Sequence, residues 1–111
     1  MRIFSWQQSN IEHIAKHGVT LFEAQYVVEH ARRPFPEFIG DGKWKVWGKT
    51  AEGRYLQVIF VYVPDEQVDV DSLTAGDLIS FSEGDATVVF VIHAMELTAD
   101  QKRQARKRGV K

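Results

Sequence analysis

The sequence contains no cysteine, so disulfide bonds and thiolate metal sites are both excluded. It also lacks any apolar run approaching the roughly 20 residues of a membrane span, and its first ten residues do not contain the apolar core of a signal peptide. With 111 residues, the chain is long enough for one domain with a single core. We therefore expect a cytoplasmic protein made of one domain, residues 1–111.

Positive charge is missing from residues 63–85, which hold seven of the 15 acidic residues and no lysine or arginine. All 14 basic residues therefore lie outside this stretch, although the net charge of the whole chain is only -1. The last eleven residues, in turn, contain no acid. A basic surface attracts phosphate groups, so this division favours an anionic partner. A solvated tail that aids solubility is the alternative.

Residues 41–63 contain two strand-like runs joined by a turn at Gly53, which is available for a positive φ. The second run, 56–63, is almost continuously apolar, which is typical of a central strand covered on both faces. Period-two alternation places Lys43, Lys45, Trp47 and Lys49 on one face and Trp44 and Val46 on the other, buried face. These cations and Arg54 predict a site for an anionic partner at this end of the sheet. Protection of an edge strand against aggregation is the alternative role for the lysines.

Three capping-box patterns predict helix starts, each with Ser or Thr followed three residues later by Glu or Gln. They are Ser9 with Glu12, Thr20 with Glu23, and Thr98 with Gln101. The second helix is amphipathic and ends before Pro34, because proline cannot donate the next backbone hydrogen bond. The last helix carries a basic stripe, since Lys102 and Arg106 are four residues apart.

An acidic insert at about residues 64–86 separates the central strand from a third strand at 87–95. The apolar run 78–81 predicts an added strand, and its flanks predict turns. The predicted fold is α+β, with two N-terminal helices packed on an antiparallel sheet and a C-terminal basic helix. Ile3, Phe4 and Trp6 are apolar enough for a short first strand or for a segment that lies on the core. Two hypotheses remain open for the insert: it covers and inhibits the cationic end of the sheet, or it extends the sheet with its acids in solvent.

Histidines supply a candidate acid–base group and a candidate metal pair. His13 and His17 are four residues apart on the first helix, a spacing that can place two imidazoles on one metal. No third ligand is evident, so the sequence predicts neither a metal site nor a cofactor. His93 is expected on the same strand face as Val91 and Met95, either as a general base or as a hydrogen-bonded core residue.

Three segments, in the same order and covering most of the chain outside the insert, resemble the BrnT family of bacterial toxins. They are NIEHIAKHGVT with the following Glu23-Ala24 pair, WGKTAEGRYL (47–56) and VIHAMELTADQKRQARKR (91–108). The resemblance implies a RelE-like fold and a metal-independent endoribonuclease that is the toxin of a type II toxin–antitoxin system. It also implies RNA as substrate, attack by the RNA's own 2′-OH, and a cognate acidic, DNA-binding antitoxin as partner. The oligomeric state stays open, with a homodimer as one option.

The resemblance carries over to particular residues. It places Lys16 and His17 on the family's K-H-G turn, Arg54 on its G-R hairpin, and Lys102 and Arg103 on its final helix. The candidate catalytic residues are Arg54, His93, Lys16 and His17, and the candidate contacts to RNA or a partner are Lys45, Trp47, Lys49, Lys102, Arg103 and Arg106. Met95 stands where the family has arginine, and Ala105 where it has tyrosine. These departures support the alternative of a BrnT-like binding module with weakened catalysis that holds an acidic protein or nucleic acid.

Overall fold

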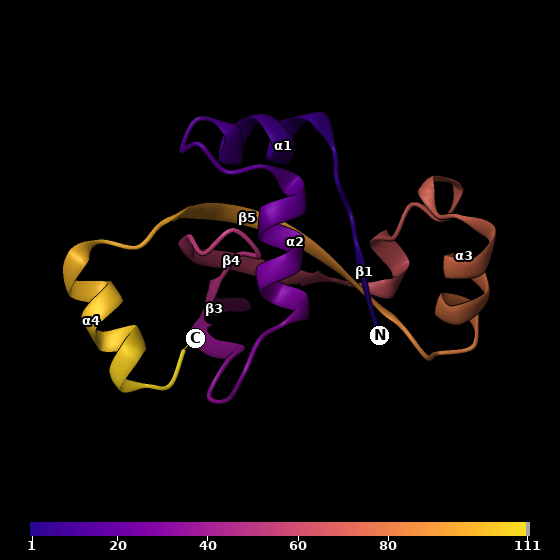
Figure 1. Ribbon diagram of the computed structural model, residues 1–111. Helices are drawn as coiled ribbons and strands as arrows, with labels where there is room; N and C mark the ends of the chain where they lie inside the picture. The colour runs from indigo at the N-terminus through magenta and orange to yellow at the C-terminus, as the bar shows by residue number, and fades with distance from the viewer. Residues whose placement is uncertain (111) are drawn as a thin grey trace.

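The computed structural model describes residues 1–110 and shows a mixed sheet with helices around it (Figure 1). Within this range the strands are β1 (Arg2–Phe4), β2 (Glu37–Gly40), β3 (Lys43–Lys49), β4 (Tyr55–Val63) and β5 (Thr87–Glu96). The α-helices are α1 (Gln8–Ala15), α2 (Leu21–Glu29), α3 (Ala75–Ser82) and α4 (Ala99–Lys107). Two 3₁₀ turns, Asp65–Gln67 and Val70–Ser72, precede α3. None of the described helices is long and apolar enough to cross a membrane.

The strands lie in the order β1-β5-β4-β3-β2, with β4 in the centre as predicted. The pairs β2–β3, β3–β4 and β4–β5 are antiparallel, whereas β1 pairs in parallel with the first residues of β5. The α+β class is therefore confirmed, but the prediction of an antiparallel sheet is wrong at this edge. A parallel pair joins segments that are far apart in sequence, so local pattern gives no sign of it.

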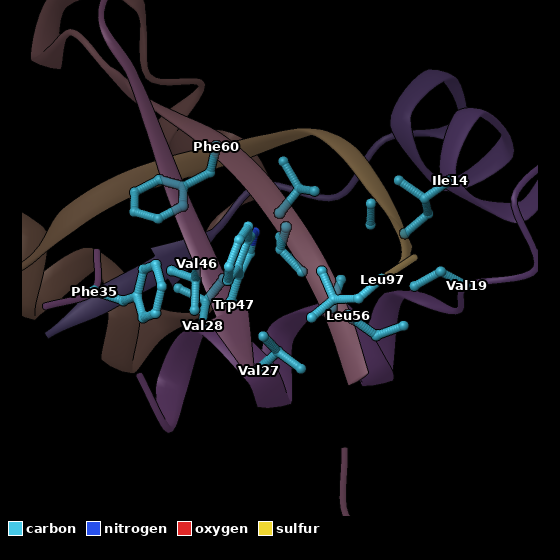
Figure 2. Packing of buried hydrophobic residues seen from close by; sticks show 14 of the residues in the cluster. Ile14, Val19, Val27, Val28, Phe35, Val46, Trp47, Leu56, Phe60 and Leu97 are labelled. Carbon is cyan, nitrogen blue, oxygen red and sulfur yellow. The ribbon is translucent and has the colours of Figure 1, made fainter. Parts of the chain in front are cut away.

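On one face of β4, Leu56 and Phe60 (Figure 2), together with Val58, are fully buried in the core. Helix α2 covers this face with Val27 and Val28, which are also buried. The intervening residues of β4, such as Ile59, are only half-buried. The prediction that β4 is covered on both faces is therefore wrong, because an antiparallel sheet can leave one face partly in solvent.

The β3–β4 hairpin forms as the alternation predicted. Lys45, Trp47 and Lys49 pair with alternate residues of β4 on the half-buried side, and Val46 is buried on the α2 side. Gly53 has a φ of +94°, the positive value that the turn requires. We call the half-buried side the open face.

The starts of α2 and α4 match their predicted capping boxes, whereas α1 starts differently. Gln7 caps α1, and its backbone N–H donates to Asn10 Oδ1 at 2.8 Å. The predicted pair, Ser9 and Glu12, lies inside the helix. The side chain of Asn10 decides the start, because it is buried and uses its polar atoms at this end of the helix.

The acidic insert does not add a strand, because its apolar run lies in α3. Thr74 caps this helix by accepting a hydrogen bond from Asp77 N–H, a local signal that favours a helix over a turn. Phe81 and Leu73 pack against Ile3, Ala86 and Val88. The insert thus lies where β4 ends and β5 begins, at the opposite end of the sheet from α4 and the cationic hairpin turn (Figure 1). It therefore does not cover the cationic end, as the first hypothesis required.

Candidate functional site

Helix α1 lies against the edge of β5 just beyond the short strand β1. The side-chain amide of Asn10 fixes this position, because its Nδ2 donates to Ser5 O at 3.1 Å and to Val91 O at 3.2 Å. Val91 is beyond the last residue of β5 that pairs with β1, so Asn10 provides the partner that its carbonyl needs. The C-terminal part of α1, with His13, therefore lies next to the following residues of β5.

A β-bulge sets the direction of His93. Val91 pairs with Phe60, and Ala94 pairs with Val58. The buried residues Val91 and Ala94 therefore share a face of the sheet although they are three positions apart in β5. The extra residue reverses the alternation, and His93 pairs with Ile59 on the open face. The prediction that His93 shares a face with Val91 is therefore wrong, whereas Met95, which pairs with Gln57, is on the same face as His93.

His13, His17 and His93 converge where α1 meets β5, and we call them the imidazole cluster. The ring centroids lie 5.9 Å apart for His13 and His17, 6.1 Å for His13 and His93, and 5.2 Å for His17 and His93. One nitrogen from each ring lies within 4.8 Å of the other two. His13 and His17 are exposed, and His93 is half-buried. The structure thus supplies the third histidine that the sequence left unidentified.

The surroundings of His93 lower its pKa. Burial lowers its pKa from the usual 6.5, and the positive charges that His17 and His13 can carry lower it further. His93 is consequently neutral at pH 7, with a lone pair free to accept a proton or to bind a metal ion.

Arg54 clamps the turn that carries His17. Its Nη1 donates to Glu23 Oε2 at 2.7 Å and to Gly18 O at 3.2 Å. Burial raises the pKa of the Glu23 carboxyl. The hydrogen bond from the Thr20 backbone N–H and the hydrogen bond and positive charge of Arg54 lower it by more, so the pKa lies below 4.5. Lys16, the C-terminal cap residue of α1, is exposed beside this turn. Arg54 therefore holds the turn in place through contacts within the protein, and Lys16 is the more accessible of the two cations.

Trp47 is not available as a surface contact, because it is only 5% exposed on the open face. Phe35 packs against its ring, and Lys45 Nζ lies 4.6 Å from the ring centroid. Glu37 binds Lys45 at 3.2 Å and Arg108 at 2.6 Å, and hydrogen bonds first from Arg108 and then from Lys45 lower the pKa of Glu37. These contacts join β2, β3 and the end of α4, so we infer that the residues that make them stabilise the fold rather than bind a partner.

The remaining predicted cations lie around α4. Lys49 and Arg106 each lie 5.7 Å from the ring of Tyr55, on the open face. Lys102 pairs with Glu96 at 3.6 Å, and Arg103 pairs with Asp100 within the helix. Lys49 and Arg106 thus form a cationic pair beside an aromatic ring, whereas Lys102 and Arg103 are partly neutralised by acids.

The open face links this pair to the imidazole cluster. Tyr55, Gln57 and Ile59 follow one another along it, and Gln57 and Ile59 pair with Met95 and His93. Of the four candidate catalytic residues, His17 and His93 meet directly, Arg54 contacts the same turn through Gly18, and Lys16 lies at its start. No protein-family model matches this chain, and no curated protein matches its sequence.

Proposed function

We propose that this protein is a BrnT-like toxin with a RelE-like fold that cleaves RNA without a metal. The proposal is carried by one observation: His17 and His93, candidates from distant parts of the sequence, have ring centroids only 5.2 Å apart on an accessible surface. Cleavage by the 2′-OH needs a base to take its proton and an acid to protonate the leaving 5′ oxygen. Two neighbouring imidazoles can supply both.

In the proposed reaction, neutral His93 removes the proton from the 2′-OH, and the oxygen attacks the adjacent phosphorus. His17, acting as the general acid, protonates the 5′ oxygen as the P–O bond breaks. The products are a 2′,3′-cyclic phosphate and a 5′ hydroxyl. Lys16 supplies positive charge near the phosphate, and Arg54 acts as a positioning residue for the turn. RNA would lie along the open face toward Lys49 and Arg106, the two cations that flank the half-buried ring of Tyr55.

The test is cleavage of a defined RNA by the purified chain in excess EDTA, with the product ends identified. We expect His17→Ala and His93→Ala each to lower the rate by about 10²-fold or more, which is the usual contribution of an acid or base. His30→Ala is the matched control, because His30 stacks on Tyr26 at the end of α2, outside the cluster. Cleavage that both cluster variants retain would refute the assignment.

Two observations favour the alternative of a binding module. Met95 lies beside His93 on the open face, where the BrnT resemblance implies an arginine, and several basic residues pair with acids. A binding module would hold RNA or an acidic protein without cutting it. Retained RNA binding without cleavage, together with normal growth of cells that express the chain, would support it. Growth arrest relieved by His93→Ala would support the toxin, and release of that arrest by a co-expressed acidic antitoxin would identify the partner.

A further inference from the structure

We infer that the imidazole cluster binds one divalent transition-metal ion of the Zn²⁺ class, through His13, His17 and His93. The motivating observation is that one nitrogen from each ring lies within 4.8 Å of the others. Three nitrogens bound to a tetrahedral Zn²⁺ at 2.0–2.1 Å lie roughly 3.4 Å from one another. Each nitrogen–nitrogen distance therefore has to shorten by about 1.4 Å at most. Rotation of the exposed His13 and His17 side chains can provide this change.

The backbone around the cluster is already held in place. His17 N–H donates to Ile14 O at 3.0 Å and Gly18 N–H donates to Ala15 O at 2.9 Å, so the turn after α1 is closed. Arg54 binds Gly18 O from the hairpin side. Asn10 fixes α1 against β5. Metal binding thus requires side-chain rotation rather than movement of helix and strand, which limits the ordering cost of binding.

The donor set decides the class of ion. All three ligands are imidazole nitrogens, and the group contains no carboxylate. Imidazole suits Zn²⁺, Ni²⁺, Co²⁺ and Cu²⁺, whereas Mg²⁺ and Ca²⁺ prefer oxygen ligands. Three protein ligands leave a fourth tetrahedral position open to water or to an exchangeable anion. The site therefore resembles an open metal centre rather than a closed structural one.

Metal binding has a consequence for RNA cleavage, and this part alone rests on the proposed function. The ion would occupy the lone pair of His93 and bind His17, so neither imidazole could transfer protons. Zn²⁺ should therefore inhibit cleavage, and EDTA should restore it. A metal-dependent hydrolase would behave in the opposite way, because EDTA would stop it.

The binding test uses the untagged chain, stripped of metal with EDTA and dialysed free of chelator. We expect calorimetry to give one equivalent of Zn²⁺ with a micromolar or lower dissociation constant, and Co²⁺ to develop the visible absorption of a four-coordinate complex. His13→Ala, His17→Ala and His93→Ala should each weaken Co²⁺ binding at least tenfold, since even losses of supporting groups cost 10–100-fold. His30→Ala should bind as the wild type does. Mg²⁺ should give no heat.

The outcomes separate this inference from the proposed function. Absence of Zn²⁺ binding below millimolar concentration, or binding that survives His13→Ala, would overturn the metal site whether or not RNA is cleaved. His13 is exposed, so its replacement is not expected to disturb folding, and circular dichroism checks this. Zn²⁺ binding with the expected variant pattern, in a protein that cleaves no RNA, would confirm the metal site and refute the proposed ribonuclease.

Discussion

Replacing Asn10 tests how the site is assembled, because this one side chain joins α1 to β5. Asn10 is 3% exposed and makes three hydrogen bonds: from Gln7 N–H, to Ser5 O and to Val91 O. At about 1 kcal/mol net for each, Asn10→Ala should lower the free energy of unfolding by about 3 kcal/mol. Asn10→Asp keeps the acceptor but turns an oxygen toward two carbonyls, so its loss should be at least as large.

Denaturant unfolding followed by tryptophan fluorescence measures this change, and Co²⁺ titration of the folded variant measures the effect on the site. We expect Co²⁺ affinity to fall about tenfold or more, because α1 then loses its fixed position beside His93. Gln8→Ala is the control, since the Gln8 side chain bonds Glu12 on the exposed side of α1; a surface change of this kind should cost less than about 0.5 kcal/mol. A loss below about 1 kcal/mol for Asn10→Ala would refute the reasoning.

Three further predictions concern other contacts. Gly48→Ala would place a Cβ 2.9 Å from Val27 Cγ1 and should destabilise the fold by about 1–3 kcal/mol in thermal unfolding. In a double variant that also carries Val27→Ala, most of the destabilisation caused by Gly48→Ala should disappear. Additive losses from the two substitutions would argue against the clash. Glu23→Gln should cost about 1 kcal/mol near pH 7. Since the folded-state pKa of Glu23 lies below 4.5, this difference should persist above 4.5 and disappear as pH falls through the lowered pKa, so a pH-independent difference would contradict the pairing with Arg54. Phe81→Ser should lower the melting temperature but leave RNA affinity unchanged, because the insert packs at the end of the sheet away from the cationic hairpin turn. Raised RNA affinity would support the hypothesis that the insert inhibits the cationic end.

The features that the sequence predicted well depend on neighbours only a few positions apart. The capping boxes of α2 and α4 satisfy backbone groups within one helical turn, and the alternation of β3 follows from the geometry of a strand. The insert shows the limit of this reasoning. Its apolar run is short enough for either a strand or a helix. The feature that favours the helix is local: Thr74 caps it by accepting a hydrogen bond from Asp77 N–H.

The imidazole cluster required tertiary information of three kinds. The spacing of His13 and His17 was visible in the sequence, but the partner for them came from β5, at the other end of the chain. The direction of His93 depended on a β-bulge, and a bulge is fixed by cross-strand register rather than by the strand's own residues. The fixed position of α1 depended on Asn10 and an edge carbonyl of β5.

The sequence by itself determined the α+β class, the central hairpin, the second and last helices, and the separation of acidic from basic residues. These follow from composition and from short-range geometry, which each segment carries within itself. Only the tertiary structure decided that β1 runs parallel to β5, that Arg54 is held by Glu23, and that three histidines meet. Each of these depends on which distant backbone groups and side chains become neighbours when the core is buried, and that is a property of the whole chain.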